Sequence, residues 1–572
     1  MTIASPARAE RRGFGIDLSK PVLYGFAALL CVLIVLPMSW LLIYSFSDGK
    51  GSFTLSNFVT LFSDPTFREP LVTTFIISTS ASLICCAVAA PMGWLVARTD
   101  LPFSGMIRAL VTASFVTPPF LGAIAWEILA APNSGLLNKV FRSITGAGPD
   151  VHVFNIYSLS GLIFVISCYT FPYVFVLVAN SLDRTPGELE DASSILGGGR
   201  WHTARRITIP LVLPALLAGA LVAFLQAMTL FGSPAILALP AGFHTMTTKI
   251  WSLFQYPPKP ELAAAAALPL LVITVMLLRA EFMILGRRGY SVVGGKYGQP
   301  RLIPLHAWRW PIFLFCLLLL ALPVFLPYGA LLNAALSPVA TTFVTFTNMT
   351  LHNFEFVLFE LSATRLALKN TVILGSATAT IGTLIAVIIA YVTARQAVTG
   401  WRMLGFLATA PIAIPGIVLG VGLFIAYTRP PFVLYGTLWI LLIAFVTIAL
   451  PAAYQQLQAA FRTIHPELED ASRILGATRL KTLRQITAPL LRTGVIATWC
   501  FIFVGVMREL SAAIILFTSE TKVISVLIYD LNEGGDLGAI SVIGIGMLLI
   551  TFAVVIAVNR IPGFGSIRFR NS

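Results

Sequence analysis

The sequence predicts an all-α polytopic membrane protein with about twelve transmembrane helices, arranged as two parallel six-helix repeats. Hydrophobic residues make up 57% of the chain and charged residues only 11%, and the mean hydropathy is +0.88. Soluble domains contain about 25% charged residues, so this composition excludes an ordinary soluble globule. Several apolar runs exceed about 18 residues, which is enough for a helix to cross the hydrocarbon of a bilayer. A charged stretch also occurs twice, at residues 188–210 and 467–489.

The first half is expected to occupy residues 21–286. A basic segment, residues 1–20, precedes an apolar run that is too long for a cleavable signal peptide and has no small-residue cleavage site after it. We therefore interpret this run as a retained first span. The six spans expected in this half lie at about residues 21–46, 71–97, 106–131, 158–181, 207–231 and 262–286.

The second half is expected to occupy residues 311–572, after a basic linker at residues 287–310. The linker contains five arginine or lysine residues and no acidic residue, and it is rich in glycine and proline. The six spans expected in the second half lie at about residues 311–336, 367–394, 403–427, 433–457, 487–517 and 538–559.

Basic residues also predict which side of the membrane each segment faces. They gather in the N-terminal segment, the linker and the C-terminal tail, and such segments face the cytoplasm. Six spans per half bring all three to the same side, so both termini and the two charged stretches are expected to be cytoplasmic. The halves then insert the same way up, as parallel repeats. The net charge of +14 follows from the same rule, so we expect a lipid bilayer and no nucleic acid as partner.

The charged stretch has the chemistry of a short helix followed by a turn. When the copy that starts at Glu188 is aligned with the copy that starts at Glu467, 16 of 24 positions are identical without a gap. Leu189, Ala192, Ile195 and Leu196 share one face at helical spacing, and Gly197 is expected to end the helix in a left-handed conformation. The small apolar face suits docking to a soluble partner. One charged copy alone would be ordinary for a cytoplasmic loop, but two copies at matching positions favour docking.

The two copies resemble the "EAA" loop of ABC importer permeases. The residues that match are Asp191-Ala192 with Gly197, and Asp470-Ala471 with Gly476; Asp stands where the family usually has Glu, although Glu190 and Glu469 come one position earlier. The resemblance implies a type I importer fold in the bacterial cytoplasmic (inner) membrane. It also implies that these residues couple the chain to two copies of an ABC ATPase subunit, and that an extracytoplasmic substrate-binding protein is a further partner.

No ATPase activity or cofactor is expected in this chain. The sequence contains no G-x-x-x-x-G-K-[ST] phosphate loop, so ATP is expected on the partner subunit. A membrane-bound enzyme is disfavoured because the six histidines and six cysteines show no metal-ligand spacing, so no metal or catalytic site is expected. A twelve-span secondary transporter remains as an alternative, although such carriers usually bury ionisable residues near the midplane, and most spans here have none.

Ferric iron is the substrate that the sequence favours. Two permease halves fused in one chain resemble the ferric-iron permeases. The stretches Phe231–Trp251 and Met507–Phe517 also look like sequence segments common in that family. Thiamine, polyamine and aminophosphonate permeases are relatives with similar loops, and these substrates stay open.

Two features mark candidate pathway residues. Prolines interrupt corresponding spans, the third and the ninth, and broken helices can mark a transport site, although prolines also make ordinary kinks. A charged pair lies about two thirds of the way along the eleventh span, towards the external face, where the first half has Thr229 and Leu230. Its carboxylate is expected to line the external mouth of the pathway and meet a cationic substrate, unless the pair is structural or the span ends earlier. The candidates are Pro118, Pro119, Pro411, Pro415, Arg508 and Glu509.

Overall fold

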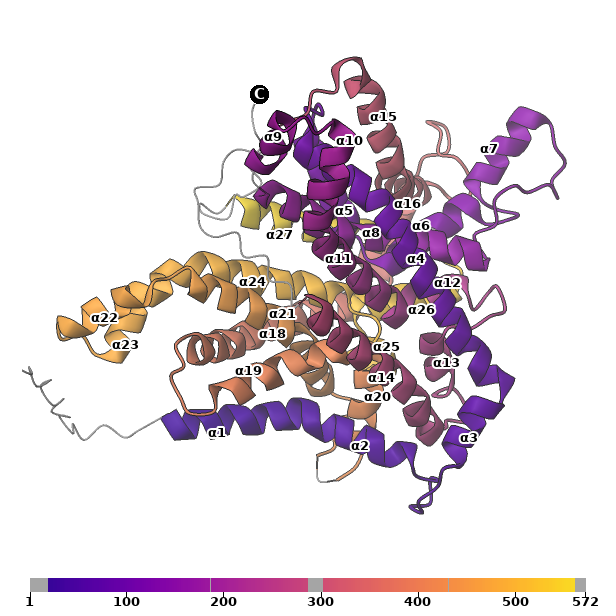
Figure 1. The fold of residues 1–572 in the computed structure, drawn as a ribbon. Helices are drawn as coiled ribbons and strands as arrows, with labels where there is room; N and C mark the ends of the chain where they lie inside the picture. The colour runs from indigo at the N-terminus through magenta and orange to yellow at the C-terminus, as the bar shows by residue number, and fades with distance from the viewer. Residues whose placement is uncertain (1–18, 186, 286–301, 431, 561–572) are drawn as a thin grey trace, which may run out of the picture.

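The computed structural model describes residues 19–185, 187–285, 302–430 and 432–560. Nearly all of the expected N-terminal segment, most of the expected linker and the last twelve residues of the chain lie outside the described residues. Within the described ranges every regular element is a helix and none is a strand, which confirms the all-α prediction (Figure 1).

Ten of the described helices are long and apolar enough to cross a membrane, and two bent helix pairs raise the number to as many as twelve. The expected count of about twelve is therefore met when each bent pair is one span. The helices of the first half are α1 (Ser19–Leu30), η1 (Cys31–Val35), α2 (Leu36–Ser45), α3 (Ser56–Ser63), α4 (Pro65–Arg98), α5 (Ser104–Val116), α6 (Pro119–Ala130), α7 (Leu136–Thr145), α8 (Leu159–Arg184), α9 (Glu188–Ile195), α10 (Arg200–Thr203), η2 (Ala204–Thr208), α11 (Ile209–Thr229), α12 (Gly232–Leu237), α13 (Met246–Ser252) and α14 (Pro260–Leu285).

The second half repeats this order. Its helices are η3 (His306–Trp308), α15 (Arg309–Leu320), η4 (Ala321–Phe325), α16 (Leu326–Leu336), α17 (His352–Glu355), η5 (Phe356–Glu360), α18 (Ser362–Ala394), α19 (Trp401–Thr409), η6 (Ala410–Ala413), α20 (Gly416–Tyr427), α21 (Leu438–Arg462), α22 (Pro466–Ile474), α23 (Arg479–Thr482), η7 (Leu483–Thr487), α24 (Ala488–Arg508), α25 (Ala513–Leu516), η8 (Ser519–Thr521), α26 (Ile524–Glu533) and α27 (Leu537–Asn559).

The third and ninth spans are broken rather than continuous, which corrects the expected single spans at 106–131 and 403–427. The chain bends by 97° between α5 and α6 and by 107° between the α19–η6 segment and α20. Pro118 and Pro415 stand at the two breaks with extended backbones, at ψ 131 and ψ 143. Proline lacks the N–H that would continue the helical ladder and disfavours a helical residue before it, so the break falls at these positions.

The eleventh span is shorter than the expected 487–517. Helix α24 ends at Arg508, and Glu509 is extended at ψ 113. Apolar residues continue to Phe517, but they form α25 and the segment beyond it instead of one long helix. In the first half α11 ends at Thr229, which is the repeat equivalent of Arg508, so the two helices end at matching positions.

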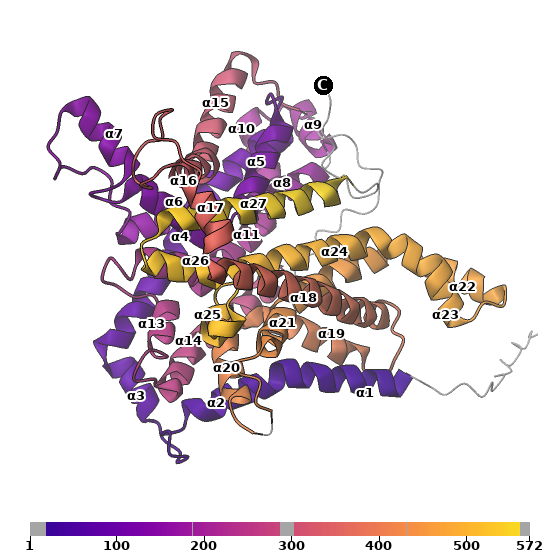
Figure 2. The same cartoon turned by 180° about the vertical axis from the view of Figure 1, so that it is seen from behind.

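The first span of each half packs on the other half (Figure 2). Helix α2 lies against α20, and α16 lies against α6. The Tyr427 hydroxyl donates a hydrogen bond of 3.0 Å to the Val32 carbonyl, and the hydroxyls of Tyr328 and Thr117 are 2.6 Å apart. The halves are therefore interlocked by reciprocal exchange of their first spans.

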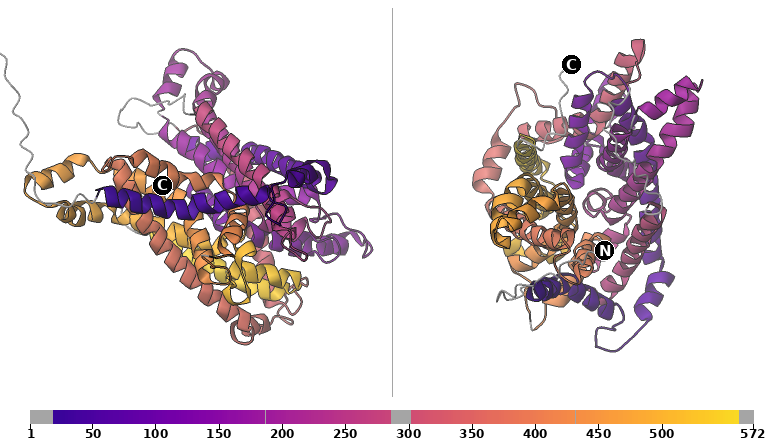
Figure 3. Two further views of the ribbon diagram at one scale, coloured as in Figure 1. Left: turned by 90° about the horizontal axis from the view of Figure 1, so that it is seen from below. Right: turned by 60° about the vertical axis from the view of Figure 1, so that its left-hand side comes forward.

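The two halves diverge towards one side of the molecule. Figure 3 shows two groups of helices that separate in this way, and Figure 1 places α9 and α22 at the ends of separate arms. The duplicated stretches therefore stand apart from each other, each at the end of its own half.

Candidate functional site

Each duplicated stretch forms a helical hairpin beyond the end of a long helix. We call α9–α10 the first hairpin and α22–α23 the second hairpin. Gly197 and Gly476 turn the chain with φ +83 and φ +87, the left-handed conformation that the sequence predicts for them. An added Cβ would meet nothing within 4 Å at either glycine, so the backbone angle alone requires glycine there.

An apolar pair at the tip of each hairpin is exposed. Ile195 and Leu196 are 85% and 87% exposed, and the matching Ile474 and Leu475 are 85% and 88% exposed. Ala192 and Ala471 are exposed on the same hairpins. Large apolar side chains that are exposed together are typical of surfaces that contact another protein or lipid. The same pair therefore offers the same surface at two places on the molecule.

The second glutamate of each stretch, Glu190 or Glu469, faces inward and holds its hairpin to the following helix. Thr208 donates a hydrogen bond of 2.9 Å from its hydroxyl to Glu190, which is only 8% exposed. The matching Thr487 donates a bond of 3.1 Å to Glu469. These two glutamates therefore position the hairpins, whereas Asp470 is exposed. A second matched bond joins the hydroxyls of Ser193 and Thr203, 2.7 Å apart, and of Ser472 and Thr482, 2.9 Å apart.

Two arginines that the sequence analysis missed, one in each half, join the segment just before a hairpin to the end of a long helix. Arg98 Nη2 donates a bond of 2.8 Å to the Thr185 carbonyl, and Arg395 Nη2 donates one of 3.1 Å to the Ile464 carbonyl. Thr185 and Ile464 each stand three positions before the first glutamate of their copy, Glu188 and Glu467, so the two contacts match in the repeat. The available signal was a single arginine at the end of the second span of each half.

A central cavity of about 1370 Å³ lies between the two halves. Pro119, Pro411, Pro415, Arg508 and Glu509 all line it, whereas Pro118 is not part of the lining. At the other end the lining reaches Glu281 in α14, Gln455 in α21 and Val554 in α27, near the C-terminal ends of those helices. Because α21 leads directly into the second hairpin, the cavity extends towards the side of the molecule that carries the hairpins.

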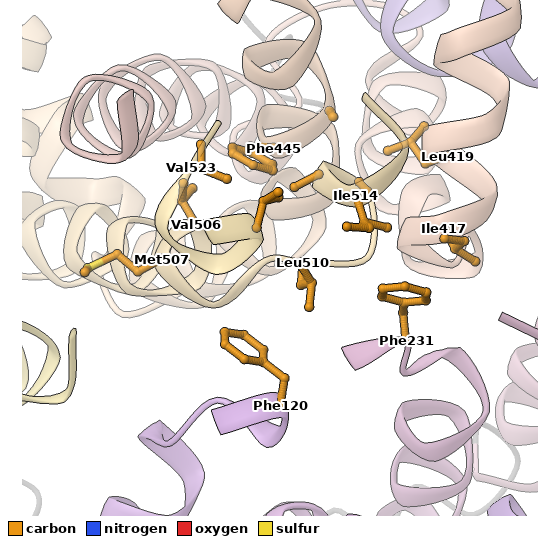
Figure 4. Close-up of a cluster of buried hydrophobic side chains, with 14 of the residues drawn as sticks. Phe120, Phe231, Ile417, Leu419, Phe445, Val506, Met507, Leu510, Ile514 and Val523 are labelled. Atoms are coloured by element: carbon orange, nitrogen blue, oxygen red, sulfur yellow. The ribbon is translucent and has the colours of Figure 1, made fainter. Parts of the chain in front are cut away.

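A cluster of buried apolar side chains, which we call the apolar barrier, lies next to the cavity-lining residues Pro119, Leu230, Gly416 and Glu509 (Figure 4). It consists of Phe120 and Phe231 from the first half and Ile417 and Leu510 from the second, all at most 3% exposed. Phe231 and Leu510 each stand two positions after the last residue of α11 and α24, Thr229 and Arg508. Phe120 and Ile417 each follow a break proline by two positions. The barrier therefore has matched contributions from both halves.

The barrier is tightly packed. A Cβ at Gly232 would come within 2.6 Å of Phe120 and 3.2 Å of Leu510, so the backbone of α12 reaches the barrier only because glycine stands there. The two halves meet at this point without room for a further side chain.

Arg508 and Glu509 lie where the cavity meets the barrier, instead of part of the way along a helix. Glu509 Oε1 accepts a bond of 3.0 Å from the Ala512 amide, and its carbonyl accepts one of 2.7 Å from Ser525. The guanidinium of Arg508 lies over the Phe115 ring, 5.6 Å from its centre. In the described part of the chain no ion pair joins Arg508 to Glu509, and no group of three His, Cys, Asp or Glu side chains could hold a metal ion.

Comparison with known proteins gives a family match in both halves. The family described as "Binding-protein-dependent transport system inner membrane component" matches residues 89–284 and 382–562. Each matched region includes one hairpin and one bent helix pair.

Two similar curated proteins are described as ferric transport permeases. "Ferric transport system permease protein FbpB" of Actinobacillus pleuropneumoniae is 26% identical over 476 residues, which is 81% of this chain and 66% of the relative. "Putative ferric transport system permease protein FbpB 1" of Haemophilus influenzae is 27% identical over 436 residues, which is 74% of this chain and 65% of the relative. The chain thus spans just under two thirds of the length of these relatives.

A similar solved structure is described as a bacterial ABC transporter involved in the import of the acidic polysaccharide alginate. It is 16% identical, with a TM-score of 0.39, and the match covers 48% of this chain and 96% of that one.

Proposed function

The chain belongs to the family of binding-protein-dependent transport system inner membrane components, and on that premise we propose that it is the permease subunit of an ATP-driven importer. As a multi-span helical protein of this family, it is a transport component rather than a member of an enzyme family. The central cavity, lined from both halves, is then the translocation pathway.

The observation that carries the proposal is the matched pair of hairpins. Each offers an exposed Ile–Leu pair, held in place by the same glutamate–threonine contact. Two identical surfaces suit two copies of one partner, so each hairpin docks into one ABC ATPase subunit. ATP binds on that partner, and this chain itself holds no cofactor. The docking residues are Ala192, Ile195, Leu196, Ala471, Ile474 and Leu475.

The proposed orientation places the hairpins and both termini in the cytoplasm. The central cavity then extends towards the cytoplasm, and the apolar barrier separates it from the external face, where a substrate-binding protein delivers the cargo. Closure of the ATPase dimer would draw the two hairpins together. Because each hairpin is fixed to the next long helix, this movement would be transmitted to the helices that line the cavity.

Ferric iron is the proposed substrate. The support comes from relatives described as ferric transport permeases, which match 74% and 81% of this chain. A second candidate is 2-aminoethylphosphonate, because a Salmonella paratyphi A protein described as a putative permease for it is 26% identical over 151 residues. That match covers only 26% of this chain, so it supports the second candidate less.

Reconstitution tests the proposal. The chain, its ATPase and its binding protein are placed in liposomes, and uptake of radioactive iron is followed with and without ATP. We expect uptake that requires ATP and the loaded binding protein, and no ATP hydrolysis by the chain alone. Uptake driven by a proton or sodium gradient without ATP would instead support a secondary transporter. Uptake of labelled 2-aminoethylphosphonate but not iron would support the second candidate.

A further inference from the structure

Among the described residues that line the central cavity, one is cationic, and it lies at the end next to the apolar barrier. Arg508 is the last residue of α24, and its side chain lines the cavity. One face of its guanidinium rests on Phe115, 5.6 Å from the ring centre. This cation–π contact orients the planar group but leaves the N–H groups along its edge available for hydrogen bonds.

In the described part of the chain these N–H groups have no protein hydrogen-bond partner. A guanidinium carries five N–H donors, yet within the described residues Arg508 donates no hydrogen bond, and its Nε atom is buried without a partner. A buried unpaired donor costs free energy, and a charged one costs more than a neutral one. The site is therefore incomplete without something that accepts hydrogen bonds from the guanidinium.

The neighbouring carboxylate does not complete the site. Glu509 Oε1 accepts from the Ala512 amide, and no ion pair forms between the two adjacent side chains in the described structure. Thr229, the matching residue of the first half, also lines the cavity, and so does Tyr173, whose ring packs against Phe115 at 5.1 Å. Both halves thus supply polar groups near the same end of the cavity.

We propose that Arg508 forms an anion-binding subsite of the translocation pathway, for a carboxylate or phosphate group carried by the cargo. A planar guanidinium can donate two parallel hydrogen bonds to the two oxygens of such a group, and the unpaired N–H groups of Arg508 are donors of this kind. This assignment rests on the proposed function: a ferric ion that enters the pathway with anionic oxygen ligands would present those ligands to Arg508.

Binding is tested on the full chain in lipid nanodiscs. Equilibrium dialysis with labelled citrate and, separately, labelled inorganic phosphate measures affinity, with and without ferric iron. We expect at least one anion to bind, and Arg508→Thr to weaken its binding by about tenfold or more, the loss expected for one charge-assisted hydrogen bond. Threonine is the natural residue at the matching helix end, Thr229, so this variant suits the fold. Arg508→Lys keeps the charge and should retain part of the affinity.

Arg492→Thr is the matched control, because Arg492 is an exposed residue on the same helix outside the cavity lining. It removes the same charge and should leave binding unchanged. Binding of citrate alone or phosphate alone would support the subsite and identify its chemistry. Absence of binding for both anions, or equal affinity in wild type and Arg508→Thr, would overturn it. Iron uptake by the wild-type complex is measured separately, so failure of the proposed function is distinguished from failure of the subsite.

Discussion

Arg395 holds Glu469 through two donors on one oxygen: Nε and Nη2 lie 3.1 Å and 3.0 Å from Oε1. Both side chains are only 12% exposed, so solvent screens this ion pair weakly. The matching Arg98 reaches the Thr185 carbonyl, but its Nε and Nη1 atoms are buried without partners, and in the described residues no ion pair joins it to Glu190. The second hairpin is therefore anchored to the end of α18 more firmly than the first hairpin is anchored to the end of α4.

This difference predicts unequal coupling energies in double-mutant cycles. Combining Arg395→Gln with Glu469→Gln should give a coupling energy of about 1–3 kcal/mol in the free energy of unfolding, because the pair is mostly buried. The cycle of Arg98→Gln with Glu190→Gln should give a value near zero. Denaturant unfolding in detergent measures both, and equal coupling in the two halves would contradict the asymmetry.

The exposed apolar pairs should govern ATPase binding without affecting the fold. Ile195→Asp with Leu196→Asp, or Ile474→Asp with Leu475→Asp, should leave thermal stability unchanged because these side chains are 85–88% exposed. Each double variant should weaken ATPase binding by at least about 2 kcal/mol, the loss typical of a central contact residue. Phe346→Asp is the control, since Phe346 is fully exposed in a loop of the second half. Pull-down of the ATPase measures the effect, and undiminished capture would refute the docking surface.

The turn glycines should tolerate only residues that accept a left-handed backbone. Gly197→Val or Gly476→Val should cost about 1–3 kcal/mol of local stability, because a β-branched residue is strained at φ +83 or φ +87. Asparagine at the same position should restore part of the loss. Gly199→Val is the matched control, with open space around it and no left-handed angle. Iron uptake and assembly with the ATPase are measured for each variant. If Gly199→Val reduces them as much as the turn variants do, the backbone angle is not the cause.

Removing bulk from the apolar barrier should produce a leak. Phe231→Ala and Leu510→Ala remove side chains that are at most 3% exposed and pack at the meeting point of the halves. Each should cost about 2–5 kcal/mol of stability and open the cavity towards the external face. Proteoliposomes loaded with a small fluorescent dye should lose it without ATP, whereas wild type should retain it. If a folded double variant retains the dye, the residues that block leakage lie elsewhere.

Glu509 should act mainly through its hydrogen bond to the Ala512 amide. Glu509→Gln keeps an oxygen acceptor there, so it should fold normally and retain most iron uptake. Glu509→Ala loses the acceptor and should cost about 1 kcal/mol, as for other capping side chains. Thermal unfolding and uptake are measured together. Loss of uptake in a normally folded Glu509→Gln variant would instead support the direct contact with a cationic substrate that the sequence suggested.

The sequence predicted features that depend on local rules. Gly197 and Gly476 turn the chain as expected, since a helix end followed by glycine needs no information from distant residues. The end of α24 was missed because a mostly apolar run continues from Leu510 to Phe517, and hydropathy does not register a backbone turn. That turn depends on Glu509 and on packing against Phe120 and Gly232 of the other half.

Long-range contacts were also outside the reach of sequence reasoning. Arg98 and Arg395 look like ordinary residues at the ends of spans. Their partners, Thr185 and Glu469, are distant in sequence and come close only in the folded structure. The exchange of first spans likewise depends on which helix packs where, and hydropathy carries no such information.

That exchange constrains the order in which the protein can be assembled. Helix α2 leaves the ribosome among the first segments. Its packing partner α20, residues 416–427, is synthesised much later. At Gly422 the two helices approach so closely that an added Cβ would lie 2.8 Å from Met38. The first span must therefore wait in the lipid, with part of its final contact surface uncovered, until most of the chain has been synthesised. Burial of the first span is therefore a late step of biogenesis, in which the beginning of the polypeptide packs against a segment synthesised long afterwards.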